Sequence, residues 1–238
     1  MSNGTETSKY KSLAKDTGLF AISMFGSKIL NFLLTPLYTS VLATDEFGIA
    51  DLIITTIQFV YPVFTLAIAD ATLRFAMDKE KSPECVLGTS LVFILLSVIF
   101  IMLVKPIFGS DLGEYWTVFV STFALFNLQN VLSNYAKGVG KTALFAAQSL
   151  IQTAVIITSN IYFLLVMDMG LQGYLISSII GYAVPTAMLF FGTKVYKSFK
   201  QVRVDLGLIK EMLAYSVPMI PTMLAWSLNT SLDKYMLI

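Results

Sequence analysis

The chain of 238 residues contains no histidine and a single cysteine, Cys85. The lack of histidine excludes histidine acid–base catalysis, histidine-ligated metals and Ser-His-Asp hydrolysis. One cysteine can form neither an internal disulfide nor a thiolate cluster, so we expect Cys85 to be a passive residue at the start of a helix. The composition therefore predicts no metal site and no cofactor.

Charge is also scarce, at 13% of residues, whereas soluble proteins carry about 25%. The 16 basic and 15 acidic residues leave a net charge of +1, which argues against a nucleic-acid partner. Hydrophobic residues make up 56% of the chain and the mean hydropathy is +0.74. A soluble domain this apolar would lack the polar surface needed to stay dispersed, so we predict an all-α integral membrane protein.

Long apolar runs follow one another along almost the whole chain. A run of about 18 or more residues predicts a membrane-spanning helix. Six complete spans are predicted, and a seventh begins near Met212 and continues to Ile238. The six are Gly18–Leu42, Gly48–Ala69, Val86–Val104, Tyr115–Ala136, Leu144–Met167 and Gly173–Phe191.

Basic residues gather in alternate connections between these spans. By the positive-inside rule this places the N-terminus in the cytoplasm. The opposite connections contain one lysine, Lys105, and several acidic residues. We also predict that Val204–Tyr215 is an interfacial amphipathic segment, with a solvated basic loop as the alternative. The basic residues of the predicted cytoplasmic side are Lys9, Lys11, Lys15, Arg74, Lys79, Lys81, Lys137, Lys141, Lys194, Lys197, Lys200, Arg203 and Lys210.

Polar side chains inside spans are candidates for function, because each costs free energy unless it faces a cavity or a partner. Lys28 lies about ten residues into the first span, roughly 15 Å along the helix. A lone ammonium at that depth costs at least ~2.5–3.5 kcal/mol. We therefore expect a cavity, an acidic partner or an anionic ligand beside Lys28.

Other candidates follow helical spacing on neighbouring spans. The amide and cationic candidates are Lys28, Asn31, Arg74, Asn127, Asn130 and Asn134. The other charged candidates are Asp51, Asp70, Asp233 and Lys234. The alternative is structural: amides often join membrane helices, at about 0.6 kcal/mol each, and charged groups near helix ends form interfacial pairs. The glutamines of the fifth span, Gln148 and Gln152, are open to the same two interpretations.

Three segments together resemble bacterial polysaccharide flippases of the Wzx type, in the multidrug/oligosaccharidyl-lipid/polysaccharide exporter superfamily. The opening of that family is similar to Lys28–Thr55, KILNFLLTPLYTSVLATDEFGIADLIIT. The end of its second helix is similar to Ala69–Phe75, ADATLRF. The start of its second half is similar to Tyr215–Ile238, YSVPMIPTMLAWSLNTSLDKYMLI, although the family commonly has arginine at the position of Lys234.

The resemblance implies a two-lobe transporter, of which this chain supplies the six-helix N-terminal lobe and one further helix. On that basis residues 1–17 form a cytoplasmic tail, 18–193 the lobe, 194–211 a basic linker and 212–238 the first helix of a truncated second lobe. It implies movement of an undecaprenyl-pyrophosphate-linked oligosaccharide from the inner to the outer leaflet of a bacterial inner membrane, for O-antigen or another surface polysaccharide. Membrane lipids, a polysaccharide polymerase and glycosyltransferases are the implied partners. With such a substrate, the amide and cationic candidates named above are expected to bind it, and the other charged candidates to balance charge or couple to an ion. No covalent chemistry is needed, so we predict that the protein is not an enzyme.

Four other functions stay open at this stage. The nearest is a cation-coupled multidrug or metabolite antiporter of the same superfamily, for which an acidic, aromatic cavity is typical. A flippase for a lipid-linked peptidoglycan precursor shares the fold and the charge requirements. An integral-membrane transferase or polymerase is less favoured because the outer connections are short. A scaffold protein would bury its polar faces in helix contacts and have no cavity.

Overall fold

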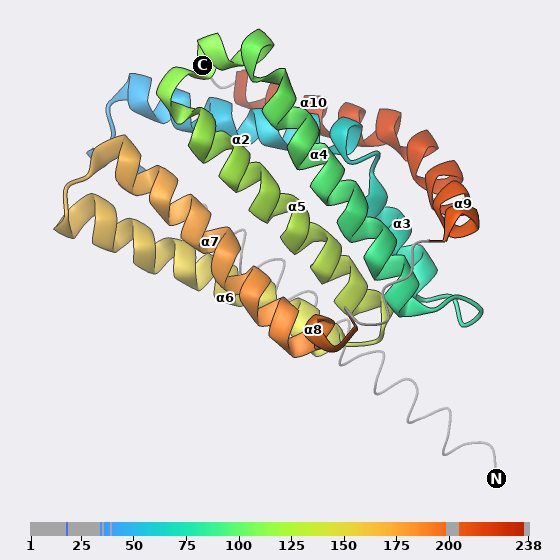
Figure 1. The fold of residues 1–238 in the computed structure, drawn as a ribbon. Helices are drawn as coiled ribbons and strands as arrows, with labels where there is room; N and C mark the ends of the chain where they lie inside the picture. The colour runs from blue at the N-terminus through green and yellow to red at the C-terminus, as the bar shows by residue number, and fades with distance from the viewer. Residues whose placement is uncertain (1–17, 19–33, 35, 39, 199–204, 236–238) are drawn as a thin grey trace.

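The computed structural model describes residues 18, 34, 36–38, 40–198 and 205–235, and these contain helices and turns but no strand. The helices form one bundle, with α5 running through its middle (Figure 1). This confirms the predicted all-α architecture. The helices are α2 Thr44–Phe64, α3 Ile68–Ala76, α4 Pro83–Leu112, α5 Trp116–Gly138, α6 Thr142–Asn160, α7 Gly170–Thr193, α8 Val195–Ser198, α9 Leu206–Ser216 and α10 Ile220–Tyr235.

Four helices of the described chain are long and apolar enough to cross a membrane: Thr44–Phe64, Pro83–Lys105, Thr142–Val166 and Gly170–Thr193. They cover most of the second, third, fifth and sixth predicted spans. Helix α5 occupies the fourth predicted span but is not among these four, because its amide side chains lower its hydropathy. Most of the first predicted span, Gly18–Leu42, lies outside the described residues.

The second predicted span is wrong in one respect, because it is not a single continuous helix. Helix α2 ends in a Schellman motif, in which the Ala67 N–H donates to the Pro62 carbonyl and the Leu66 N–H donates to the Val63 carbonyl. Leu66 and Ala67 have φ values of 53° and 51°, the left-handed region in which glycine is usual. Helix α3 then starts in a new direction (Figure 1).

The seventh predicted span is also divided. Helix α9 is followed by a 3₁₀ turn, Val217–Met219, and then by α10. In α9 Leu208, Met212 and Ser216 are buried at four-residue spacing, whereas Lys210 and Glu211 are exposed. The stretch predicted to be amphipathic is thus an amphipathic helix, and it packs against α3 while α10 packs against α2.

Helices α6 and α7 form a tight antiparallel hairpin. Gly173, Ser177 and Gly181 recur every fourth residue on α7, and small residues in such a row allow two helices to approach closely. A β-carbon on Gly181 would overlap the side chain of Ile156. The last turn before the connection, Ile161–Val166, is π-helical. This hairpin and α5 together line the first cavity described below.

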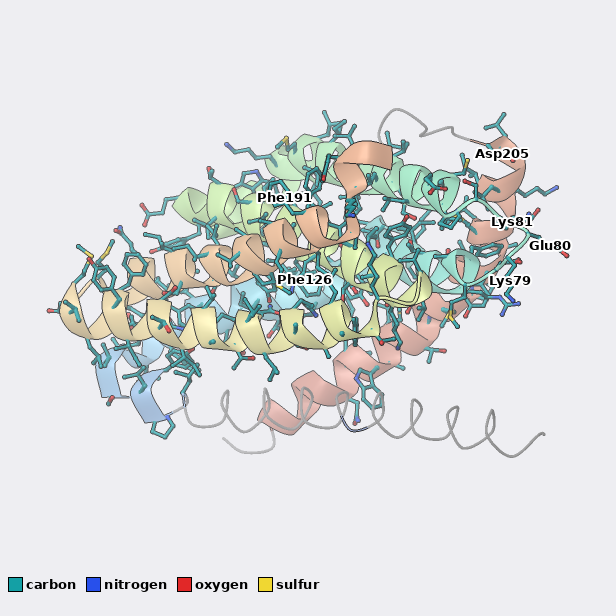
Figure 2. All side chains as sticks on the ribbon, turned by 90° about the horizontal axis from the view of Figure 1, so that it is seen from below. Lys79, Glu80, Lys81, Phe126, Phe191 and Asp205 are labelled. Carbon is teal, nitrogen blue, oxygen red and sulfur yellow. The ribbon has the colours of Figure 1, made fainter. Side chains whose placement is uncertain are left out.

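The connections gather at two ends of the bundle. At one end the Lys141 ammonium donates to the Gly192 carbonyl at 2.9 Å, and Lys81 forms an ion pair with Glu211 at 2.6 Å. Figure 2 shows Lys79, Lys81 and Asp205 together there. At the other end a β-carbon on Gly170 would lie 3.3 Å from the carboxylate of Glu46. The connections predicted to be cytoplasmic therefore share one end, as alternating spans require.

Candidate functional site

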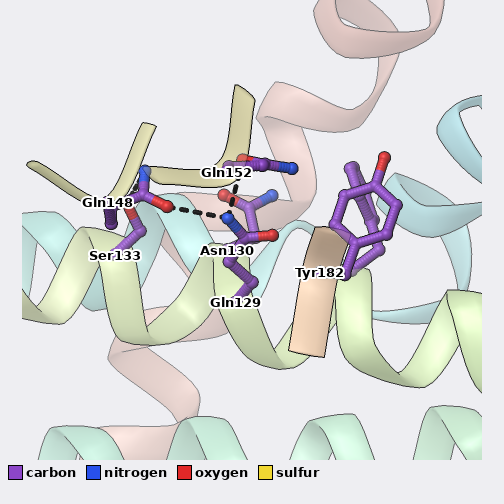
Figure 3. Close-up of a pocket in the computed structure, with 7 residues that line it drawn as sticks. Gln129, Asn130, Ser133, Gln148, Gln152 and Tyr182 are labelled. Carbon is purple, nitrogen blue, oxygen red and sulfur yellow. Dashed lines mark hydrogen bonds between the residues drawn. The ribbon is translucent and has the colours of Figure 1, made fainter. Parts of the chain in front are cut away.

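A network of side-chain amides joins α5 to α6 (Figure 3). The Gln129 amide nitrogen donates to the Gln148 carbonyl oxygen at 2.7 Å and to that of Gln152 at 2.8 Å. The Gln148 amide in turn donates to the Ser133 hydroxyl at 3.3 Å. On α5 the Asn134 amide donates to the Asn130 carbonyl oxygen at 3.3 Å.

The local sequence explains why these side chains meet. Helices α5 and α6 are joined by the tight turn Val139–Lys141, in which Gly140 has a φ of 79°. A turn this short makes the helices antiparallel neighbours. Gln129 and Ser133 are four residues apart on α5, as are Gln148 and Gln152 on α6, so each pair lies on one helix face. The hairpin brings the two faces together.

The amide network borders a cavity of about 270 Å³. Asn130 and Gln152 line it, and the ring of Tyr182 on α7 forms the side opposite these amides (Figure 3). Phe126, one turn before Asn130, completes the apolar part of the lining. The full lining is Phe126, Gln129, Asn130, Ser133, Gln148, Gln152 and Tyr182.

A second cavity, of about 410 Å³, adjoins the first. Phe126 lines both, and its ring centroid lies 5.6 Å from that of Tyr182 and 5.3 Å from that of Tyr61. Tyr61 also interacts with the Asn130 side chain, which joins the two linings by a polar contact. The second lining comes from α2, α5 and α10 and consists of Gln58, Tyr61, Phe126, Thr222, Met223, Trp226 and Ser227.

The asparagines predicted as one stripe differ in their surroundings. Asn130 lines the first cavity, and Asn134 is hydrogen-bonded to it. Asn127 is only 3% exposed, and its amide donates to the Phe123 carbonyl of its own helix at 2.8 Å. Asn127 therefore does not line either cavity.

None of the described charged candidates is in the lining of either cavity, although Asp70 lies close enough to Tyr61 of the second lining to interact with it electrostatically. Arg74 is exposed on α3, with its guanidinium 5.2 Å from the centre of the Tyr215 ring. Asp70 lies half-buried in the first turn of α3. Asp51 on α2 accepts a hydrogen bond from the Thr55 hydroxyl at 3.5 Å.

Four predicted site residues are not tested by this geometry. Lys28 and Asn31 lie outside the described residues. Asp233 and Lys234 belong to the last turns of α10, and their side chains also lie outside what the structure describes. Their roles stay predictions.

Sequence reasoning missed four residues of the first cavity: Phe126, Gln129, Ser133 and Tyr182. A signal for two of them was present, because Gln129 and Ser133 have the same four-residue spacing as Gln148 and Gln152. Tyr182 gave no such signal, since an aromatic residue in an apolar helix is indistinguishable from a packing residue. Its position follows only from the packing of α7 against α5.

The lining can form hydrogen bonds and aromatic contacts. Amides both donate and accept hydrogen bonds, and aromatic rings offer flat apolar surface. Among the described residues no group of three His, Cys, Asp or Glu side chains is placed to hold a metal ion. The cavity is thus suited to binding an uncharged polar molecule.

Comparison with known proteins identifies the family. The sequence model of the family described as "Polysaccharide biosynthesis protein" matches residues 13–238. The chain belongs to this family. Its members are generally transporters or flippases rather than enzymes, and with the four membrane-capable helices this makes the protein a multi-pass membrane protein. No curated protein and no solved structure matches the chain.

Proposed function

We propose that the protein moves an undecaprenyl-pyrophosphate-linked oligosaccharide from the inner to the outer leaflet of a bacterial membrane, for surface polysaccharide synthesis. The observation that supports this most directly is the pair of adjoining cavities in a bundle that contains four membrane-capable helices. A hydrated glycan cannot cross hydrocarbon without partners for its polar groups, because each unsatisfied group costs several kcal/mol. Amide, hydroxyl and aromatic side chains supply such partners inside the bundle.

The charged candidates complete the proposal. Lys28, which the sequence predicts to lie near the middle of the membrane, binds the pyrophosphate during passage. Arg74 meets the headgroup at the basic end of the bundle, where its guanidinium is exposed. Stacking on the Tyr215 ring leaves the edge of the guanidinium available to phosphate oxygens. Asp51, Asp70, Asp233 and Lys234 balance charge or couple transport to an ion.

Transfer between leaflets can be measured directly in reconstituted vesicles. The substrate is a fluorescent lipid-linked oligosaccharide, and an impermeant quencher reports the fraction exposed outside. We expect the protein to make the inner pool accessible, and Lys28→Ala to slow this transfer. A charge-assisted hydrogen bond contributes about 1.5–3 kcal/mol, so the rate falls roughly tenfold to a hundredfold. Lys15→Ala, in the N-terminal tail, is the control and transfers at the original rate.

Other results would point elsewhere. Efflux of organic cations in place of lipid transfer identifies a drug antiporter. Faster transfer of a lipid-linked peptidoglycan precursor than of the oligosaccharide identifies the other kind of flippase. An unchanged rate in Lys28→Ala removes Lys28 from the mechanism while leaving the transport activity established.

A further inference from the structure

Both cavities are lined by side chains that carry no charge at neutral pH among the described residues. A pyrophosphate in such a place would lose its hydration and gain no counter-charge, which is strongly unfavourable. The anionic part of a lipid-linked glycan therefore fits these cavities poorly. An uncharged, hydroxyl-rich group fits them well, because amides satisfy hydroxyls as donor and as acceptor.

The hydrogen bonds of the amide network leave some groups available to a ligand. Gln129 uses both hydrogens of its amide on Gln148 and Gln152, and so fixes the orientation of Gln152. Among the described residues, the Gln152 amide nitrogen has no hydrogen-bond acceptor, although the side chain lines the cavity. Asn130 lines the same cavity beside it (Figure 3). The Gln152 donor and the Asn130 side chain, which contacts Asn134 and Tyr61, are held in place before binding and lose little entropy when a ligand arrives.

The remaining side of the cavity is apolar. Tyr182 and Phe126 stand edge to face, with ring planes at 89°. A sugar ring has the same two-sided character, with hydroxyls at its rim and C–H groups on its faces. The C–H face can pack against an aromatic ring while the rim hydroxyls meet the amides.

We propose that this cavity binds one uncharged sugar residue of the transported glycan, with Asn130 and Gln152 hydrogen-bonded to its hydroxyls and Tyr182 packed against its ring. The inference rests on the proposed transport of a lipid-linked glycan and adds which part of that substrate these residues contact. The volume of about 270 Å³ lies just below the usual range for ligand pockets, ~300–1,000 Å³, and suits a group the size of one sugar residue.

The test compares two probes on the full chain in lipid nanodiscs. The first is a polyprenyl pyrophosphate that carries a neutral disaccharide, and the second is the same lipid pyrophosphate without sugar. We expect Asn130→Leu and Gln152→Leu each to weaken binding of the sugar-bearing probe by about three- to tenfold, the loss for one or two hydrogen bonds. Both variants should bind the sugar-free probe unchanged. Gln172→Leu, at an exposed position early in α7, is the matched control and should bind both probes normally.

A third probe carries a uronic acid in place of the neutral sugar and tests whether the uncharged lining disfavours an acidic sugar. This probe should bind more weakly than the neutral one. The inference is overturned if the two variants lose affinity equally for both lipid probes, since that shows a structural role for the amides. It is also overturned if they lose affinity for neither, or if the acidic sugar binds better. If the free neutral disaccharide binds and no lipid pyrophosphate does, the sugar site stands and the proposed transport function fails.

Discussion

Gly138 lies at a close approach between α3 and α5. A β-carbon there would lie 2.6 Å from the Ala76 β-carbon and 3.1 Å from the Leu73 carbonyl oxygen. One of these neighbours is backbone, and the other is a side chain that cannot rotate away. The fit at this single residue therefore sets how closely the end of α5 packs on α3.

Gly138→Ala should destabilise the protein by about 1–3 kcal/mol, the usual cost of overpacking. The measurement is the free energy of unfolding of the purified protein in mild detergent. Gly48→Ala is the control, because a β-carbon at Gly48 meets nothing within 4 Å. Equal stability of the two variants would mean that α3 shifts away from α5 without cost.

Residue spacing could predict which side chains share a helix face but not which of them meet a cavity. The sequence correctly places Asn130 and Asn134 on one side of α5. It cannot separate Asn127 from them, because the hydrogen bond from Asn127 to the Phe123 carbonyl depends on side-chain rotation. Gln129 was missed for a related reason: its importance comes from two partners on α6, and only the packing of the hairpin reveals them.

Helix α9 is attached to α3 by aromatic contacts and to the connection after α3 by an ion pair. Tyr215 packs edge-on against Phe75 at 6.3 Å between ring centres and also lies under the Arg74 guanidinium. The hydrogen bond to Glu211 raises the pKa of Lys81, so this pair contributes fully below the ordinary lysine pKa of about 10.4. The contribution is lost as the pH rises through the higher pKa of the folded state. Because the pair is exposed, the aromatic contacts should matter more.

Tyr215→Ala should release α9. The aromatic and cation–π contacts contribute about 1–2 kcal/mol together, so amide hydrogen exchange across Leu206–Ser216 should become roughly tenfold faster or more. Glu211→Gln should give a smaller increase. Leu206→Ala is the control, since Leu206 is 80% exposed at the start of the helix. A larger effect from Glu211→Gln than from Tyr215→Ala would show that the ion pair holds α9.

Hydropathy located the membrane helices but not the bends within them. Nothing in Thr65–Ala67 marks a helix end, because Leu66 and Ala67 favour helices in isolation and glycine is absent. Tertiary packing overrides that preference: Ala67 and Ile68 are completely buried. Pro218, by contrast, does mark the 3₁₀ turn between α9 and α10, although the sequence alone suggested one span there.

At the scale of the whole molecule, the basic connections lie at one end of the bundle, and their predicted location is the cytoplasm. Single-cysteine labelling tests this orientation in a background in which Cys85 is replaced by alanine. An impermeant maleimide should label Asp168→Cys in intact cells and fail to label Lys79→Cys. Permeabilised cells should show labelling of both positions, which controls for reactivity. The reverse pattern in intact cells would invert the assigned orientation.

The uncharged linings described above have an electrical consequence. A cell membrane holds a voltage, which is worth about 2.3 kcal/mol for each elementary charge moved through 100 mV. A neutral sugar that enters this uncharged cavity carries no charge through the field, so the free energy of its binding does not depend on the voltage. Any dependence of transport on voltage must therefore arise at ionisable groups elsewhere in the chain or on the pyrophosphate itself.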